Sequence, residues 1–319
     1  MHKAGSFFFC NFLRNHQRKV ININKNIGII IETNYNFAYV YLNEEIKEVT
    51  LSKDIKGIMN RTVFTGDHVV IKDNQVIEIL ERKNILSRNK VDNTKNNPKL
   101  NDTIIATNID LALIVASPNM PKLHPRFIDR YILILNKSNI DYKIVINKAD
   151  LLDEESKNII KDFKNRGLEV ILTSTFSNEG IEDLQSLIKD KQVIFVGQSG
   201  VGKSSLASAL TQNENIISSH VGNKTERGRH TTTKSSLYKL DNSSFIIDSP
   251  GIRAISIKHL DISDIKDYFK EFSEFSCKYK DCNHINEPLN DCGIKKALNS
   301  GKISKYRYES YVKLISEIK

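Results

Sequence analysis

The sequence has no tryptophan, only 4 cysteines in 319 residues, and no long apolar stretch. Because no apolar run approaches the ~18 residues of a transmembrane helix, we expect no membrane-spanning segment. Cys10 stands alone, whereas Cys277, Cys282 and Cys292 lie close together near the end. This spacing is not the framework of a disulfide-rich secreted protein, so we predict a reducing, cytoplasmic location.

Acidic residues are fewer than basic ones, 38 Asp and Glu against 47 Lys and Arg, and the formal charge is +9. This excess favours a polyanionic partner, nucleic acid before a membrane, although biased residue usage gives a similar composition. Residues 1–20 are basic and include the apolar cluster Phe7–Cys10. The cluster is shorter than the ~7–15 apolar residues of a secretory signal. An organelle-targeting leader and an upstream start are alternatives, and we favour a ragged N-terminus.

Residues 28–80 contain short β-rich segments separated by turn residues. We expect strands at Ile29–Ile31, Phe37–Tyr41, Glu48–Thr50, His68–Ile71 and Gln75–Leu80. Such closely spaced short strands predict a small antiparallel barrel, of which the OB-fold is the common nucleic-acid-binding form. A structural β-module without a ligand is the alternative. Residues 82–98 are polar and basic, and they predict a mobile linker ending near Leu100 that either contacts RNA phosphates or is only solvated.

Strands and helices alternate from residue 101 to residue 258. We expect strands at Asp110–Ala116, Tyr142–Ile146, Leu168–Leu172, Gln192–Val196 and Ser244–Ile247. We expect helices at Arg126–Asn136, Leu151–Arg166, Ile181–Lys189 and Ser205–Leu210. The alternation predicts a mostly parallel, doubly wound sheet that binds ligands at the carboxyl ends of its strands.

The segment Gly197–Ser204 reads GQSGVGKS and fits the phosphate-binding pattern G-x-x-x-x-G-K-[ST] between a strand and a helix. Glycines let successive backbone N–H groups converge on one anion, and the helix directs its positive end to the same place. Lys203 adds a cation for the β- and γ-phosphates, and Ser204 offers a hydroxyl to Mg²⁺. A glycine-rich turn with an unrelated lysine is the alternative, which the flanking strand and helix disfavour.

Three further motifs follow strand ends. Asn147–Asp150 reads NKAD and fits N-K-x-D, in which the carboxylate accepts hydrogen bonds from guanine N1–H and the exocyclic amine. Thr173–Thr175 is similar to a loop that closes over the guanine with backbone groups. Asp248–Gly251 reads DSPG, in which the aspartate holds Mg²⁺ through a water and the glycine N–H approaches the γ-phosphate. A threonine of the loop Gly228–Thr233 reaches Mg²⁺ only with GTP bound, which predicts a switch.

The order of these motifs is unusual, because the base-reading motif precedes the phosphate-binding loop. The chain resembles the circularly permuted GTPases, and most closely the ribosome small subunit-dependent GTPase A family, over nearly its whole length. The resemblance implies a multidomain α/β protein. Residues 1–90 would form an OB-like barrel with a ragged N-terminus, 101–258 a circularly permuted GTPase domain, and 259–319 a helical zinc-binding domain.

The same resemblance implies a monomeric GTP hydrolase that binds the small ribosomal subunit and its rRNA near the decoding region. Such a protein acts in late maturation of the subunit, which stimulates hydrolysis. We expect the nucleotide, GTP or GDP, to contact Asn147, Lys148, Ala149, Asp150, Ser174, Thr175, Gly197, Gln198, Ser199, Gly200, Val201, Gly202, Lys203, Ser204, Ser205, Asp248 and Gly251. We expect Mg²⁺ to contact Ser204, Thr232, Thr233 and Asp248.

The water-orienting residue is not where most small GTPases have it. Ile252 follows DSPG in place of the usual glutamine, so we expect slow intrinsic hydrolysis that depends on a partner. In the family, the histidine of the 228–233 loop is proposed to orient water, and the matching residue is His230. The resemblance therefore assigns catalysis to His230 and Lys203. Support of the loop, or contact with the subunit, is the alternative role for His230.

The tail contains Cys277, Cys282, His284 and Cys292, three thiols and one imidazole within 16 residues. This set predicts one closed, structural Zn²⁺ site. The family has the same ligand order with a shorter last gap, and three unrelated cysteines beside a surface histidine are the alternative.

The last helix carries Arg307, Tyr308 and Tyr311. These residues either contact RNA or protein, or Tyr311 belongs with Leu314 to the helix's core face. Two other functions are weighed against the ribosome-assembly GTPase. The missing glutamine motivates an RNA-binding module whose nucleotide site is a passive sensor. An ATP-dependent kinase would share the phosphate-binding loop, but NKAD disfavours it.

Overall fold

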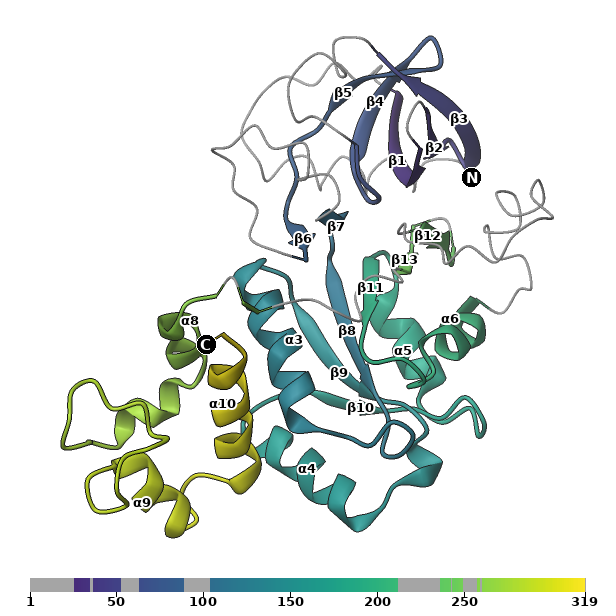
Figure 1. Ribbon diagram of the computed structural model, residues 1–319. Coiled ribbons are helices and arrows are strands. Elements are labelled where there is room, and N and C mark those ends of the chain that lie inside the picture. Colours follow the sequence, from purple (N-terminus) through teal and green to yellow (C-terminus); the bar gives the residue numbers. More distant parts are fainter. Residues whose placement is uncertain are drawn as a thin grey trace, which may run out of the picture.

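The computed structural model describes residues 26–34, 37–52, 63–88, 104–211, 236–241, 243–248, 257–258 and 260–318. Figure 1 shows a barrel at one end, a central sheet with helices on both faces, and a helical C-terminal unit beside the sheet. Within these residues, every helix is too short or too polar to cross a membrane.

The first unit is a closed five-stranded barrel with the strand order β1-β2-β3-β5-β4. Its strands are β1 (Asn26–Thr33), β2 (Phe37–Leu42), β3 (Glu45–Leu51), β4 (His68–Lys72) and β5 (Gln75–Ile79). Small and branched apolar side chains fill the interior, among them Ile30, Val40, Val49, Val69 and Val76. The five expected strands are confirmed, but β3 and β5 pair in parallel, so the barrel is not purely antiparallel.

The segment that follows the barrel is ordered, so the predicted mobile linker is wrong for residues 82–88. Arg82 donates two hydrogen bonds of 2.7 Å to the buried carboxylate of Asp67. Asn84 exchanges two hydrogen bonds of 2.8 Å with the backbone of Ile109. Strand β6 (Ile85–Ser87) pairs with β7 (Ile104–Thr107). Polar residues that are typical of a solvated linker here form hydrogen bonds with buried polar groups between the barrel and the central sheet. Residues 89–103 lie outside the described part of the chain.

The central sheet has six strands in the order β10-β9-β8-β11-β13-β12. They are β8 (Leu111–Ala116), β9 (Tyr142–Ile146), β10 (Val170–Leu172), β11 (Gln192–Val196), β12 (Ser236–Lys239) and β13 (Phe245–Asp248). All neighbours pair in parallel except the edge strand β12, which is antiparallel to β13. The mostly parallel sheet is confirmed. The sequence does not predict β12, because Leu237 is its only aliphatic residue.

Helices cover both faces of this sheet, as the doubly wound prediction requires. Helices α3 (Pro125–Lys137) and α4 (Glu154–Asn165) pack on one face, and α5 (Ile181–Ile188) and α6 (Lys203–Thr211) on the other (Figure 1). All residues of β8 are buried, because a parallel strand covered on both faces has no exposed side. Neighbouring side chains of β8 enter different cores, Ile114 with α3 and Val115 with α6.

The barrel rests on the amino end of β11. Gln192, the first residue of β11, donates side-chain hydrogen bonds to the carbonyl oxygens of Thr107 at 2.7 Å and Gly66 at 3.4 Å. Tyr41 of β2 packs edge-on against Phe245 of β13, with ring centroids 5.3 Å apart. These contacts lie opposite the carboxyl ends of the parallel strands, where sheets of this type bind ligands.

The C-terminal unit consists of α8 (Ile262–Tyr268), the short helix η4 (Lys270–Glu274), α9 (Gly293–Asn299) and α10 (Lys305–Ile318). Helix α10 lies along α3 (Figure 1). Tyr311 and Leu314 are 0% exposed, and Tyr311 packs against Phe269 and Phe272. Arg307 is also buried, with its guanidinium 3.6 Å from the centroid of the Phe269 ring. The core-face interpretation of this helix is therefore correct, and the RNA-contact interpretation is wrong for Tyr311 and Arg307.

Candidate nucleotide and metal sites

The GQSGVGKS loop leaves the carboxyl end of β11 and enters α6, as the sequence predicts. Gly197 has a φ of +143°, and a Cβ there would lie 2.1 Å from the carbonyl oxygen of Val115. Gly202 has a φ of +91°, and a Cβ there would lie 2.3 Å from the side-chain nitrogen of Asn147. Glycine is therefore required at both positions, by backbone conformation and by space.

Lys203 is the first residue of α6 and folds back over the loop. Its ammonium group donates hydrogen bonds to the carbonyl oxygens of Gly197 at 2.8 Å and Gln198 at 2.6 Å. Ser199, Gly200, Ser204 and Ser205 are exposed around it. A cation, a helix N-terminus and exposed hydroxyls thus converge on one place, which suits a phosphate group with a bound cation.

Asn147 connects three loops at the strand ends. Its buried amide donates to the carbonyl oxygen of Val201 at 3.0 Å and accepts from the Thr173 hydroxyl at 3.3 Å. The neighbouring Lys148 donates to the carbonyl oxygens of Gly200 at 2.8 Å and Met120 at 3.2 Å. The two residues therefore fix the NKAD motif against the phosphate-binding loop.

Asp150 is exposed at the end of the NKAD motif, and its orientation is set by a neighbour. The Ser174 hydroxyl donates a 2.5 Å hydrogen bond to one carboxylate oxygen of Asp150. The same hydroxyl accepts from the backbone N–H groups of Phe176 and Ser177, at 3.3 and 3.2 Å. Ser174 is expected to act through its backbone, whereas the structure gives its side chain an orienting role. Ala149 donates its N–H to the Thr173 carbonyl at 3.0 Å and closes this loop pair.

Asp248 ends β13, beside the strand that leads into the phosphate-binding loop. Its backbone therefore reaches the same edge of the sheet as the motifs above. The other predicted positions of this part of the site, Gly251, His230, Thr232 and Thr233, lie outside the described residues. Thr175 belongs to the turn after Ser174, and no hydrogen bond assigns its side chain a role.

A model of the RsgA GTPase family matches residues 79–258. That match covers more than half of the chain, including both nucleotide motifs and the DSPG motif. The chain belongs to the RsgA GTPase family. It is accordingly a GTP hydrolase, and its sheet has the circularly permuted strand order that the motif order predicts.

Named relatives of this GTPase match over most of their length. The small ribosomal subunit biogenesis GTPase RsgA of Thermotoga neapolitana is 34% identical over 302 residues, covering 91% of this chain and 96% of the relative. The protein of that name from Borreliella burgdorferi strain B31 is 36% identical over 299 residues, covering 92% and 94%.

Solved structures agree with the sequence relatives. The crystal structure of YjeQ from Thermotoga maritima has a TM-score of 0.69 and 29% identity, covering 92% of this chain and 98% of the other. The crystal structure of YloQ, a circularly permuted GTPase, has a TM-score of 0.65 and 27% identity, covering 95% and 98%.

The C-terminal unit of this RsgA-family protein brings the four expected metal ligands together. The Nδ1 atom of His284 lies 3.5, 3.3 and 3.5 Å from the sulfurs of Cys277, Cys282 and Cys292. The sulfurs of Cys277 and Cys292 are 3.9 Å apart, and all four ligand atoms lie within 4.8 Å of one another. The arrangement can hold one metal ion, and the longer gap before Cys292 does not prevent it.

Burial and hydrogen bonds set the protonation of two of the metal ligands and hold the loop that carries His284. Burial opposes ionisation of Cys277, but hydrogen bonds from the backbone N–H groups of Gly293 and Ile294 and from the thiols of Cys282 and Cys292 together lower the pKa of this thiol. Burial lowers the pKa of His284, which favours the neutral imidazole that binds metals. Tyr308 donates to the carbonyl oxygen of His284 at 2.7 Å. Tyr308 therefore supports the metal site from α10.

Proposed function

We propose that this GTPase binds the small ribosomal subunit and its rRNA, acts in late maturation of the subunit, and hydrolyses GTP faster when bound to it. The names of the relatives support this proposal, since they describe small ribosomal subunit biogenesis. The observation that carries it is the shared architecture over more than nine-tenths of the chain, barrel and C-terminal unit included. The protein acts as a monomer in the cytoplasm, where its cysteines stay reduced.

The nucleotide site is assigned as follows. The 197–204 loop holds the phosphates, with Lys203 neutralising charge as the bond to the γ-phosphate breaks. Asp150 reads guanine, because adenine offers no pair of donors to a carboxylate. Mg²⁺ bound with GTP would be held by Ser204, Asp248 and a threonine at 232 or 233, and it would neutralise charge on the phosphates. His230 orients the attacking water. The observation that supports the part of this set at the phosphate-binding loop is the exposed Ser204, which follows Lys203 at the start of α6.

The C-terminal cluster binds one structural Zn²⁺. Zinc–sulfur and zinc–nitrogen bonds of ~2.3 and ~2.0 Å in a tetrahedron place ligand atoms roughly 3.5–3.8 Å apart. The three nitrogen–sulfur separations of 3.3–3.5 Å and the Cys277–Cys292 separation of 3.9 Å are close to that requirement, and all four ligand atoms lie within 4.8 Å of one another. Three thiolates and one imidazole leave no open position, so this metal stabilises the unit and takes no part in hydrolysis.

The positive charge of the chain is unevenly distributed. Residues 104–211 and residues 260–318 each contain equal numbers of basic and acidic residues, whereas residues 1–25 contain basic residues and no acidic ones. Contact with rRNA phosphates therefore depends on basic residues outside residues 104–211 and 260–318 more than on a uniformly positive surface.

Cosedimentation with purified small ribosomal subunits tests the proposal. We expect the protein to pellet with subunits in the presence of a non-hydrolysable GTP analogue and to be released with GDP. Binding that is equal with both nucleotides would contradict release after hydrolysis, and no binding would refute the assignment of the partner.

A further inference from the structure

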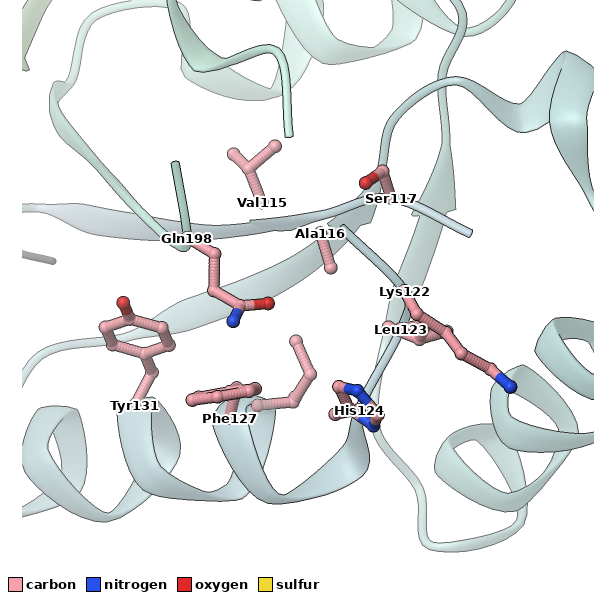
Figure 2. A pocket seen from close by; sticks show the side chains of 10 residues that line it. Val115, Ala116, Ser117, Lys122, Leu123, His124, Phe127, Tyr131 and Gln198 are labelled. Carbon is pink, nitrogen blue, oxygen red and sulfur yellow. The ribbon is translucent and has the colours of Figure 1, made fainter. Parts of the chain in front are cut away.

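Helix α3 lies directly against the phosphate-binding loop. Figure 2 shows Phe127 and Tyr131, one helical turn apart, on the side of a small hollow opposite the Gln198 side chain. Tyr131 lines this hollow together with Gln198, and the backbone N–H of Gly197, the first residue of the loop, acts on the Tyr131 oxygen. Burial raises the pKa of Tyr131 to about 12, so this phenol stays neutral. One face of α3 therefore contacts the start of the loop.

The C-terminal unit holds the same helix from another side. Asp129 is 0% exposed, and one of its oxygens accepts hydrogen bonds from Tyr268 of α8 at 2.5 Å and Arg307 of α10 at 3.2 Å. Arg166, after α4, donates to the same oxygen at 2.5 Å. Two more ion pairs join α3 to α10 and α8, Arg130–Glu317 and Lys137–Asp264.

The Asp129 contacts restrict how α3 can move relative to the C-terminal unit. Burial by itself opposes ionisation of Asp129, but Arg166 and Arg307 outweigh it and lower the pKa of the carboxyl group. A buried carboxylate that loses its partners is strongly disfavoured, so sliding α3 along α10 is costly. The helix is thus fixed on one side and in contact with the phosphate-binding loop on the other.

We propose that Asp129 and Tyr131 are positioning residues of the GTPase reaction. The C-terminal unit fixes α3 through Asp129, and α3 fixes the start of the phosphate-binding loop through Tyr131. The inference rests on the nucleotide site proposed above. Because coupling between two sites is reciprocal, nucleotide bound to the loop must in turn stabilise the contact between α3 and α10.

Hydrogen exchange of the α10 backbone, with and without GDP, tests the Tyr131 contact. The variant is Tyr131→Phe, which removes one hydroxyl, and the matched control is Tyr39→Phe on the barrel strand β2. We expect GDP to slow exchange in α10 about fivefold or more in the unmodified protein and in the control. Tyr131→Phe should still bind GDP but lose this slowing. Slowing that persists in Tyr131→Phe, or is absent from the unmodified protein, would overturn the inference.

A double-mutant cycle tests the Asp129 contact. The affinity for a fluorescent GDP analogue is measured for Asp129→Asn, for Tyr131→Phe and for both together. Residues that act through one helix should give non-additive losses, whereas additive losses would show independent effects. If Asp129→Asn does not fold, the exchange experiment on Tyr131→Phe still decides the matter. Failure of the unmodified protein to bind GDP would instead reject the nucleotide site itself.

Discussion

Removal of the Ser174 hydroxyl tests how the base-reading carboxylate is oriented. Ser174 donates a 2.5 Å hydrogen bond to Asp150, and Ser174→Ala deletes it without adding bulk. A hydrogen bond to a charged group contributes about 1.5–3 kcal/mol. Because Asp150 is exposed and water can replace the lost donor, we expect the lower end, about 1.5 kcal/mol, or roughly a tenfold rise in the Kd for GDP.

The loss in Ser174→Ala should concern the base in particular. Guanine offers Asp150 two donors, whereas hypoxanthine lacks the exocyclic amine and offers one. A misoriented Asp150 carboxylate no longer gains from the hydrogen bond to the exocyclic amine. The preference for GDP over inosine diphosphate (IDP), the hypoxanthine nucleotide, should therefore shrink in Ser174→Ala. Titration with fluorescent analogues of both nucleotides measures the two affinities, and Ser177→Ala, which removes an exposed hydroxyl from the same turn, is the control.

The Ser174 argument can fail in two ways. An unchanged Kd for GDP would mean that Asp150 needs no support from the hydroxyl. A tenfold loss that is equal for GDP and IDP would mean that the variant disturbs the loop and not the base contact. Thermal unfolding of the variant checks that it is folded at the assay temperature.

Four further predictions concern the two sites and the interdomain contact. Asp150→Asn should weaken GDP binding and favour the xanthine nucleotide in competition assays, and an unchanged base preference would count against the carboxylate role. Lys203→Ala should weaken nucleotide binding about 100-fold, since it removes charged hydrogen bonds to phosphates; undiminished binding in a fluorescence titration would reject the loop assignment. Elemental analysis should find about one zinc per chain, and Cys282→Ser should lose it and unfold the C-terminal unit; a metal-free protein with intact circular dichroism would reject the cluster. The folded-state pKa of Asp129 is lowered, so this carboxylate stabilises the fold above the ordinary Asp pKa of ~3.9, and the stabilisation is lost as pH falls through the lowered value. Acid unfolding of Asp129→Asn should lack this loss of stability. Identical acid unfolding profiles of the variant and the unmodified protein would contradict the prediction.

The arrangement of the central sheet could be predicted because its signals are local. The apolar run at Leu111–Ala116 and the loop at Gly197–Ser204 each define a strand or a strand–loop–helix unit without reference to distant residues. Parallel strands bring their carboxyl ends to one edge, so motifs far apart in sequence were expected to meet there. The contact between Asn147 and Val201 is one such meeting.

Other features could not be predicted because their partners are distant in sequence. Arg82 looks like a solvated linker residue until Asp67 is placed beside it. Arg307 looks like an RNA-binding residue, but it pairs with Asp129, which lies 178 positions earlier. Met120 contributes only a backbone carbonyl to Lys148, so no side chain signals its role. Buried polar pairs of this kind depend on tertiary packing, which residue type alone does not reveal.

The most direct test of the central claim is GTP turnover with and without purified small ribosomal subunits, at low and at high salt. We predict slow hydrolysis by the protein alone and strong stimulation by the subunit at low salt. Stimulation should weaken at high salt, because binding through phosphate contacts releases counterions. GTP that is bound but hydrolysed at the same slow rate with and without subunits would contradict a subunit-activated GTPase.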